Sequence, residues 1–128
     1  MRDPNRPFDP IINLLASFDL NGTIAHELRA DEAYNHGRTA RALVKSPELS
    51  VVASALDKGS EMKPHHSPGP AFVLVLEGKI NFRTWGEVQE DVVLGPGMSV
   101  AFSSELSHSV EALEESFILI VMGGKRPG

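Results

Sequence analysis

The sequence contains no cysteine, and its basic residues are fewer than its acidic ones. Without cysteine the chain can form neither a disulfide framework nor a thiolate metal site, so any metal ion would depend on histidine, carboxylate or water ligands. This composition fits a reducing compartment, and we expect a cytoplasmic protein. The formal net charge of −5 disfavours a nucleic-acid-binding protein, because such proteins normally carry a basic face.

Long apolar runs are also missing. No run approaches the roughly 18 apolar residues of a membrane span, and the N-terminal residues lack the apolar core of a signal peptide. We therefore expect no membrane partner. The sequence also lacks a glycine-rich phosphate loop, a nucleophile elbow and a helix-turn-helix segment, which argues against a nucleotide enzyme, a serine hydrolase and a DNA-binding regulator.

What is present is a chain of 128 residues, 41% hydrophobic, which suits one domain with a single core. Short apolar segments recur about every ten residues between turns rich in glycine and proline, a pattern that predicts an all-β sandwich or barrel. The predicted strands span residues 38–45, 49–56, 71–76, 79–83, 87–94, 98–102, 107–112 and 117–122. The run at 71–76 is continuously apolar, so we expect both of its faces to be covered.

Composition divides the chain into three segments. Residues 1–37 are predicted to form an N-terminal arm, irregular at first and partly helical around residues 23–35. Residues 38–122 are predicted to form the barrel. Residues 123–128 are predicted to form a flexible tail.

Two spaced motifs carry the most specific information. From Gly59, five residues lead to His65, and a glycine closes the segment at Gly78; from Gly97, the matching position of a second motif is His108. In this spacing the chain resembles the small single-domain cupins over about residues 45–122. The resemblance implies an RmlC-like double-stranded β-helix, or jelly-roll barrel, preceded by a short, partly helical extension.

The chain departs from the family pattern at several ligand positions. The second histidine of the first motif is replaced by Ser67, and the glutamate position falls on Ala71 or Phe72. In the second motif, the proline, glycine and asparagine positions hold Ser103, Glu105 and Ala112. Of the three histidines and one glutamate that the family uses as metal ligands, His65 and His108 remain. The chain also resembles a subgroup of short uncharacterised cupins with His-x-x-Pro-Gly-Pro and His-Ser-Val-Glu-Ala segments.

The histidines are the candidate site residues. The resemblance implies that His65 and His108 enter the barrel from strands of facing sheets and share one site. Neighbouring strand residues point to opposite faces, so His66 joins that site only if a bulge at residues 67–68 turns it inward. These three are the candidate ligands of a divalent metal ion such as Fe, Mn, Ni or Zn; alternatively, the two rings are polar residues hydrogen-bonded inside the cavity. His26 and His36 are expected at the surface.

Strand alternation predicts the wall of a cavity. If Ala71 faces inward, so do Val73 and Val75, and Val110 lies on the same side as His108. The predicted cavity residues are His65, Ser67, Val73, Phe82, Phe102, His108 and Val110; alternatively, the apolar ones simply form the core. Trp85, in a predicted turn, is either a rim contact or a surface packing residue.

The sequence therefore favours a cupin-fold protein that binds a small molecule in its barrel, as a binding or sensing module. The alternative is a metal-dependent cupin enzyme, a dioxygenase or isomerase that uses the barrel histidines, so the sequence leaves open whether the protein is an enzyme. The two-sided apolar strand at residues 72–76 and the N-terminal arm further predict a homodimer.

Overall fold

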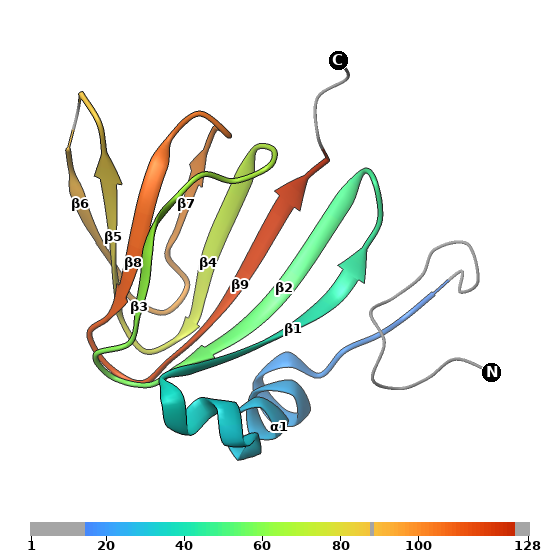
Figure 1. The fold of residues 1–128 in the computed structure, drawn as a ribbon. Coiled ribbons are helices and arrows are strands. Elements are labelled where there is room, and N and C mark those ends of the chain that lie inside the picture. Colours follow the sequence, from blue (N-terminus) through green and yellow to red (C-terminus); the bar gives the residue numbers. More distant parts are fainter. Residues whose placement is uncertain (1–14, 88, 125–128) are drawn as a thin grey trace.

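Two antiparallel β-sheets face each other in the computed structural model, which describes residues 15–87 and 89–124 (Figure 1). The five-stranded sheet has the order β1-β2-β9-β4-β7, and the four-stranded sheet has the order β3-β8-β5-β6. The strands are β1 (Arg38–Lys45), β2 (Leu49–Leu56), β3 (Glu61–His65), β4 (Ala71–Glu77), β5 (Ile80–Trp85), β6 (Asp91–Leu94), β7 (Ser99–Phe102), β8 (Ser107–Ala112) and β9 (Ser116–Gly123). The predicted all-β fold is confirmed.

Strand β3 is the one strand that the sequence did not predict. Its five residues are mostly exposed, and they include a proline and two charged side chains, so neither apolar character nor alternation marks it. β3 lies at the edge of the four-stranded sheet, where proline and charged residues are tolerated because one side of the strand makes no ladder hydrogen bonds. The predicted strand at 87–94 is shorter in the structure, where β6 begins at Asp91.

The main core fills the space between the sheets. The inward positions of β4 are Ala71, Val73 and Val75, all buried, as the alternation predicted. They pack with inward residues of the neighbouring and facing strands. The buried members of this core are Leu56, Val73, Val75, Ile80, Phe82, Leu94, Val110, Ala112 and Ile118.

A helical extension covers part of the outer face of the five-stranded sheet. It consists of a π-helical turn η1 (Leu20–Ile24), helix α1 (Ala25–Ala30) and a 3-10 turn η2 (Glu32–His36), seen beside β1 and β2 in Figure 1. Its buried residues form a second core with the outward side chains of the sheet, namely Ile24, Ala25, Leu28, Tyr34, Leu43, Ala53, Ala55 and Phe117. The predicted partly helical extension is confirmed. Among the described helices, none has the length and apolar character needed to cross a membrane.

Polar contacts tie this extension to the sheet, among them the ion pair of Glu27 in α1 with Arg41 in β1 at 2.7 Å. The hydroxyl of Tyr34 donates to a carboxylate oxygen of Glu115, 2.6 Å away, and Arg29 pairs with Glu77 at 2.8 Å. Residues 1–14 of the predicted arm lie outside the described residues, as do residues 125–128 of the predicted tail. Gly123, assigned to that tail from the sequence, is the last residue of β9.

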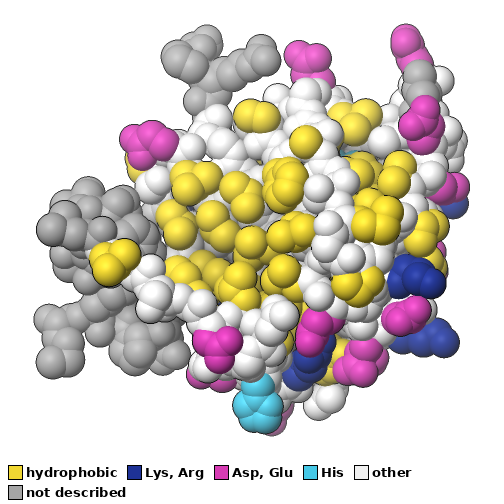
Figure 2. All heavy atoms as spheres, turned by 180° about the vertical axis from the view of Figure 1, so that it is seen from behind, with side chains coloured by type: hydrophobic (Ala, Val, Ile, Leu, Met, Phe, Trp, Pro, Cys, Tyr) yellow, Lys and Arg dark blue, Asp and Glu magenta, His cyan; other side chains and the backbone are white. Residues whose placement is uncertain are grey.

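The outward face of β4 is only partly covered within a single chain, so the chain by itself does not meet the expectation that both faces of this strand are covered. The helical extension does not reach Phe72, which is 39% exposed. Neighbouring outward side chains of β2 and β9 are also partly accessible. Together they form what we call the open apolar patch: Leu49, Val51, Phe72, Leu74, Leu119 and Val121. Figure 2 shows hydrophobic side chains gathered on the rear face, with charged side chains around them.

Candidate functional site

A β-bulge in β3 turns His65 toward the interior. Met62 pairs with Val110 and His65 pairs with His108, so two residues of β3 lie opposite the single residue Ser109 of β8. Strand side chains alternate with a period of two, so in a regular strand Met62 and His65, three residues apart, would point to opposite faces. The extra residue of the bulge places both on the inward face. His65 and His108 are therefore cross-strand neighbours in one sheet. The expectation that they enter from facing sheets is wrong.

The two imidazole rings pack against each other and against phenylalanines. The ring centroids of His65 and His108 are 4.3 Å apart. On its other sides His108 stacks on Phe82, with centroids 5.3 Å apart, and contacts Phe102 at 4.4 Å. His108 is 5% exposed, so three aromatic neighbours hold its ring in one orientation.

Backbone carbonyl groups orient both rings. Nδ1 of His65 lies 2.7 Å from the carbonyl oxygen of Lys63, and Nδ1 of His108 lies 3.2 Å from that of Leu106. Neither Nε2 atom has a hydrogen bond among the described residues. Burial lowers the pKa of His108, and the nearby His65 and His66 act in the same direction, while the contact with Leu106 partly opposes them.

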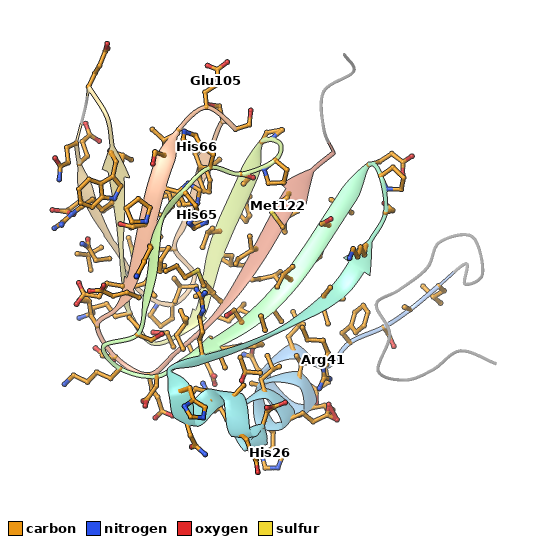
Figure 3. All side chains as sticks on the ribbon, in the orientation of Figure 1. His26, Arg41, His65, His66, Glu105 and Met122 are labelled. Atoms are coloured by element: carbon orange, nitrogen blue, oxygen red, sulfur yellow. The ribbon has the colours of Figure 1, made fainter. Side chains whose placement is uncertain are left out.

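His66 and Ser67 reach the same cavity by leaving the strand. β3 ends at His65, so the alternation that was expected to turn His66 away does not extend to it. Both residues line the cavity, and Figure 3 shows His65 and His66 on the side of the four-stranded sheet that faces Met122. The bulge lies between Met62 and His65, not at residues 67–68 as the sequence hypothesis required.

Ser67 contributes a hydroxyl group with unused hydrogen-bonding capacity. The residue is 8% exposed, and its Oγ atom has no hydrogen-bond partner among the described residues. A buried hydroxyl without a partner is destabilising, because it has lost its hydrogen bonds to bulk water. A molecule in the cavity that bonds to Ser67 would remove that penalty.

The cavity has a volume of about 230 Å³, and apolar side chains from both sheets dominate its wall. It is lined by Val52, Met62, His65, His66, Ser67, Pro68, Ala71, Val73, Phe102, His108, Val110, Ile118, Ile120 and Met122. Six of the seven cavity residues expected from the sequence are among them. The wall formed by Ile118, Ile120 and Met122 was not foreseen, although the alternation of β9 carries the information.

Other residues singled out in the sequence lie elsewhere. Phe82, expected at the cavity wall, is instead in the core behind His108, because the His108 ring lies between it and His65. Trp85 lies on the outer face of the four-stranded sheet, where its Nε1–H donates to Ser109 Oγ at 2.8 Å. Its ring is therefore not at the rim of the cavity. His26 and His36 are exposed.

The side chains around the cavity do not fit a resident metal ion. A first-row divalent ion normally takes three or more protein ligands. No group of three or more histidine, cysteine, aspartate or glutamate side chains is arranged to hold one within the described part of the chain. His65 and His108 form an oriented pair, which is short of such a set. What the pair offers is two oriented ring nitrogen atoms beside the buried, unpartnered hydroxyl group of Ser67.

Comparisons with known proteins agree with this architecture. A family model described as a cupin domain matches residues 54–122. A solved structure of a conserved protein of unknown function from Streptococcus pyogenes is 28% identical, with a TM-score of 0.63, over 70% of this chain and 76% of that one. An RmlC-like cupin protein from Desulfovibrio desulfuricans is 19% identical, with a TM-score of 0.69, over 85% of this chain and 96% of that one.

A longer enzyme shares the fold. Oxalate decarboxylase from Bacillus subtilis, which has Mn(II) centres, is 23% identical with a TM-score of 0.63, over 72% of this chain and 26% of that one. At this identity the likeness concerns the fold alone. A search of curated proteins finds no match.

Proposed function

The chain belongs to the cupin domain family, and from this premise we propose that it is a binding or sensing module for a small molecule. The ligand occupies the cavity between the two sheets, beside His65, His108 and Ser67. One observation carries the proposal: an apolar cavity of about 230 Å³ is bordered by Ser67 Oγ and by the rings of His65 and His108, whose Nε2 atoms, like that Oγ, have no hydrogen-bond partner within the described residues. Apolar walls with a few convergent polar groups are typical of ligand sites.

The size of the cavity limits the ligand. Since a water molecule occupies about 30 Å³ of liquid, the cavity corresponds to roughly eight waters. This is below the usual range for drug-sized ligands, which begins at about 300 Å³. A compact molecule of about ten non-hydrogen atoms or fewer is therefore the expected ligand.

Filling the cavity tests this function. Ala71 is 6% exposed and lines the cavity, whereas its diagonal neighbour Ala101 on β7 is exposed on the outer face. Ala71→Leu is expected to abolish binding of small aromatic probes, measured from methyl NMR shifts of Ile118 and Ile120, and Ala101→Leu is expected to leave it intact. Probes that bind the Ala71→Leu variant as tightly as the wild type would place the binding site elsewhere.

A metal-dependent cupin enzyme is the second candidate function. It is supported by the paired rings of His65 and His108, because a metal-ligating histidine commonly donates its other ring N–H to a carbonyl or carboxylate group, as both rings do here. His66 borders the same cavity, but the three histidines do not form a metal-holding group within the described residues, so this function requires His66 to turn toward the pair. Stoichiometric metal in protein purified without an affinity tag, and its loss in a His65→Ala, His108→Ala double variant, would support the enzyme. Metal-free protein that still binds the aromatic probes supports the binding module.

A second copy of this chain is the proposed partner, docked on the open apolar patch. The patch consists of six uncharged side chains, whereas the chain as a whole carries a net charge of −5. Two copies can therefore meet at this patch without bringing like-charged side chains into contact. Burying this contiguous apolar surface is favourable, because each Å² removed from water contributes about 25 cal/mol.

Light scattering at micromolar concentration tests the dimer. Wild-type protein is expected to have the mass of two chains, and Phe72→Glu is expected to have the mass of one. Val93→Glu is the matched control, because Val93 is 50% exposed on the outer face of the other sheet. A monomeric wild type, or a Phe72→Glu variant that stays dimeric, would exclude this interface.

We also propose a cytoplasmic location. The absence of cysteine supports it, because disulfides are rare in reducing compartments and this chain cannot form one. Cell fractionation with an antibody against the native protein tests the location, and recovery in a secreted fraction would contradict it.

A further inference from the structure

The hydrogen-bonding character of the cavity is set by the tautomers of two histidines. A carbonyl oxygen can only accept, so the contacts of Nδ1 with the carbonyl groups of Lys63 and Leu106 require the proton to be on Nδ1 in each ring. In the neutral imidazole the other nitrogen is then an acceptor. His65 and His108 therefore present two acceptors, both Nε2, to the cavity.

Among the described residues, no side chain donates a hydrogen bond to Nε2 of His65 or His108. The hydroxyl of Ser67 is one group that can either donate or accept, and it has no partner among the described residues. The other lining residues apart from His66 have no conventional hydrogen-bonding side chain, and none carries a carboxylate, an amide, an ammonium or a guanidinium group. These two acceptors can therefore take a hydrogen bond from a donor that enters the cavity, whether water or the hydroxyl group of a ligand.

On the basis of the proposed function, we infer that the cavity selects a compact, neutral molecule bearing a hydroxyl group, a phenol or an alcohol. The ligand hydroxyl donates to Nε2 of His65 or His108 and accepts from Ser67 Oγ–H, while its apolar body lies against Val73, Ile118 and Ile120. A ketone or ether has no proton to donate. A carboxylate would place a negative charge against two acceptor nitrogens with no cation in the cavity wall.

A neighbouring groove makes an anionic ligand the main competing hypothesis. Arg38 and Lys63 line a shallow groove that also contains His65, so a carboxylate held there would lie close to the same ring. Glu61 lines this groove as well and offsets part of its positive charge. The competing hypotheses make opposite predictions about charged and neutral probes of the same size.

Phenol, anisole and benzoate are matched probes for the full-length protein. At about pH 8, where imidazole is mostly neutral, phenol is expected to bind about tenfold more tightly than anisole, because the methyl ether removes the donor but keeps the ring. Binding is followed by methyl NMR shifts of Val73, Ile118 and Ile120. Replacing both acceptors in a His65→Leu, His108→Leu double variant is expected to reduce the preference for phenol over anisole to about twofold or less. His36→Leu, an exposed control, is expected to leave it unchanged.

The outcomes separate this inference from the proposed function. Equal binding of phenol and anisole in the cavity would overturn the inference while leaving a binding module. If benzoate binds most tightly of the three probes and Arg38→Gln weakens its binding, the inference is overturned in favour of an anion site. No shift at the cavity methyl groups with any probe, up to millimolar concentration, would count against the binding module and against the inference with it.

Discussion

Gly78 and Gly59 have the same positive φ of 87° but different surroundings. A Cβ atom at Gly59 would meet nothing, whereas one at Gly78 would collide with the backbone oxygen of Glu115 and with Ser116. Gly59→Ala is therefore expected to lower the free energy of unfolding by about 1–2 kcal/mol, the strain of a left-handed backbone. Gly78→Ala adds overpacking against backbone and is expected to lower it by about 3 kcal/mol or more. Urea unfolding measures both, and equal losses would contradict the steric account.

The buried ring of His108 makes stability depend on pH. Burial lowers its pKa in the folded protein, so below the unfolded value of about 6.5 the unfolded chain binds more protons than the folded one. The free energy of unfolding is therefore expected to fall as the pH decreases through that value, and to level off below the folded pKa.

Urea midpoints measured from about pH 8 to about pH 5 would show this fall. A His108→Gln variant, which does not titrate there, should lose less stability over the same interval. If the wild type and the variant have parallel pH profiles, the protonation of His108 is not the cause.

At the scale of elements, strands rich in apolar residues were predicted from the sequence, and the polar edge strand β3 was not. The bounds of β1, β2 and β8 follow from apolar and β-branched residues between turn signals. β3 was missed because its edge position leaves it polar and proline-containing, and its bulge depends on pairing with β8, 43 or more residues later in the chain. Spacing could align His65 and His108 with a family pattern. It could not show that their strands are neighbours, because sheet order results from long-range pairing.

The helical extension is attached to the sheet through Tyr34. Its hydroxyl donates to Glu115 across 81 residues of sequence, and burial together with that contact raises the pKa of Tyr34 above its ordinary value. Tyr34→Phe is expected to lower the free energy of unfolding by about 1 kcal/mol, because exposed Glu115 regains water when the bond is lost. Tyr34 is the only tyrosine, so its ultraviolet absorbance should show little ionisation at about pH 10 in the folded protein. Half-ionisation at that pH would contradict the buried contact.

On the scale of the whole molecule, the extension and the two sheets are expected to unfold together. Leu28 is 2% exposed in the second core, and the strands it covers also line the main core. Leu28→Ala should lower the free energy of unfolding by about 2–5 kcal/mol. The midpoint of unfolding should shift by the same amount whether it is followed by far-ultraviolet circular dichroism or by the fluorescence of Trp85, the only tryptophan.

Leu15→Ala is the control for this experiment, because Leu15 is 85% exposed. Its effect should stay within about 0.5 kcal/mol. If Leu28→Ala shifts the unfolding midpoint measured by circular dichroism but not the midpoint measured by Trp85 fluorescence, the extension unfolds as an independent unit.

The bulge in β3 also affects how this edge of the sheet can pair with a strand of another chain. β3 is an edge strand, and an edge strand with a regular row of unpaired N–H and C=O groups can recruit a strand from another chain and seed fibrils. Here the row is broken at residues 63–64, where the bulge distorts the backbone and Pro64 has no N–H to offer. The irregularity that turns His65 toward the cavity therefore also makes this edge a poor template for cross-β growth.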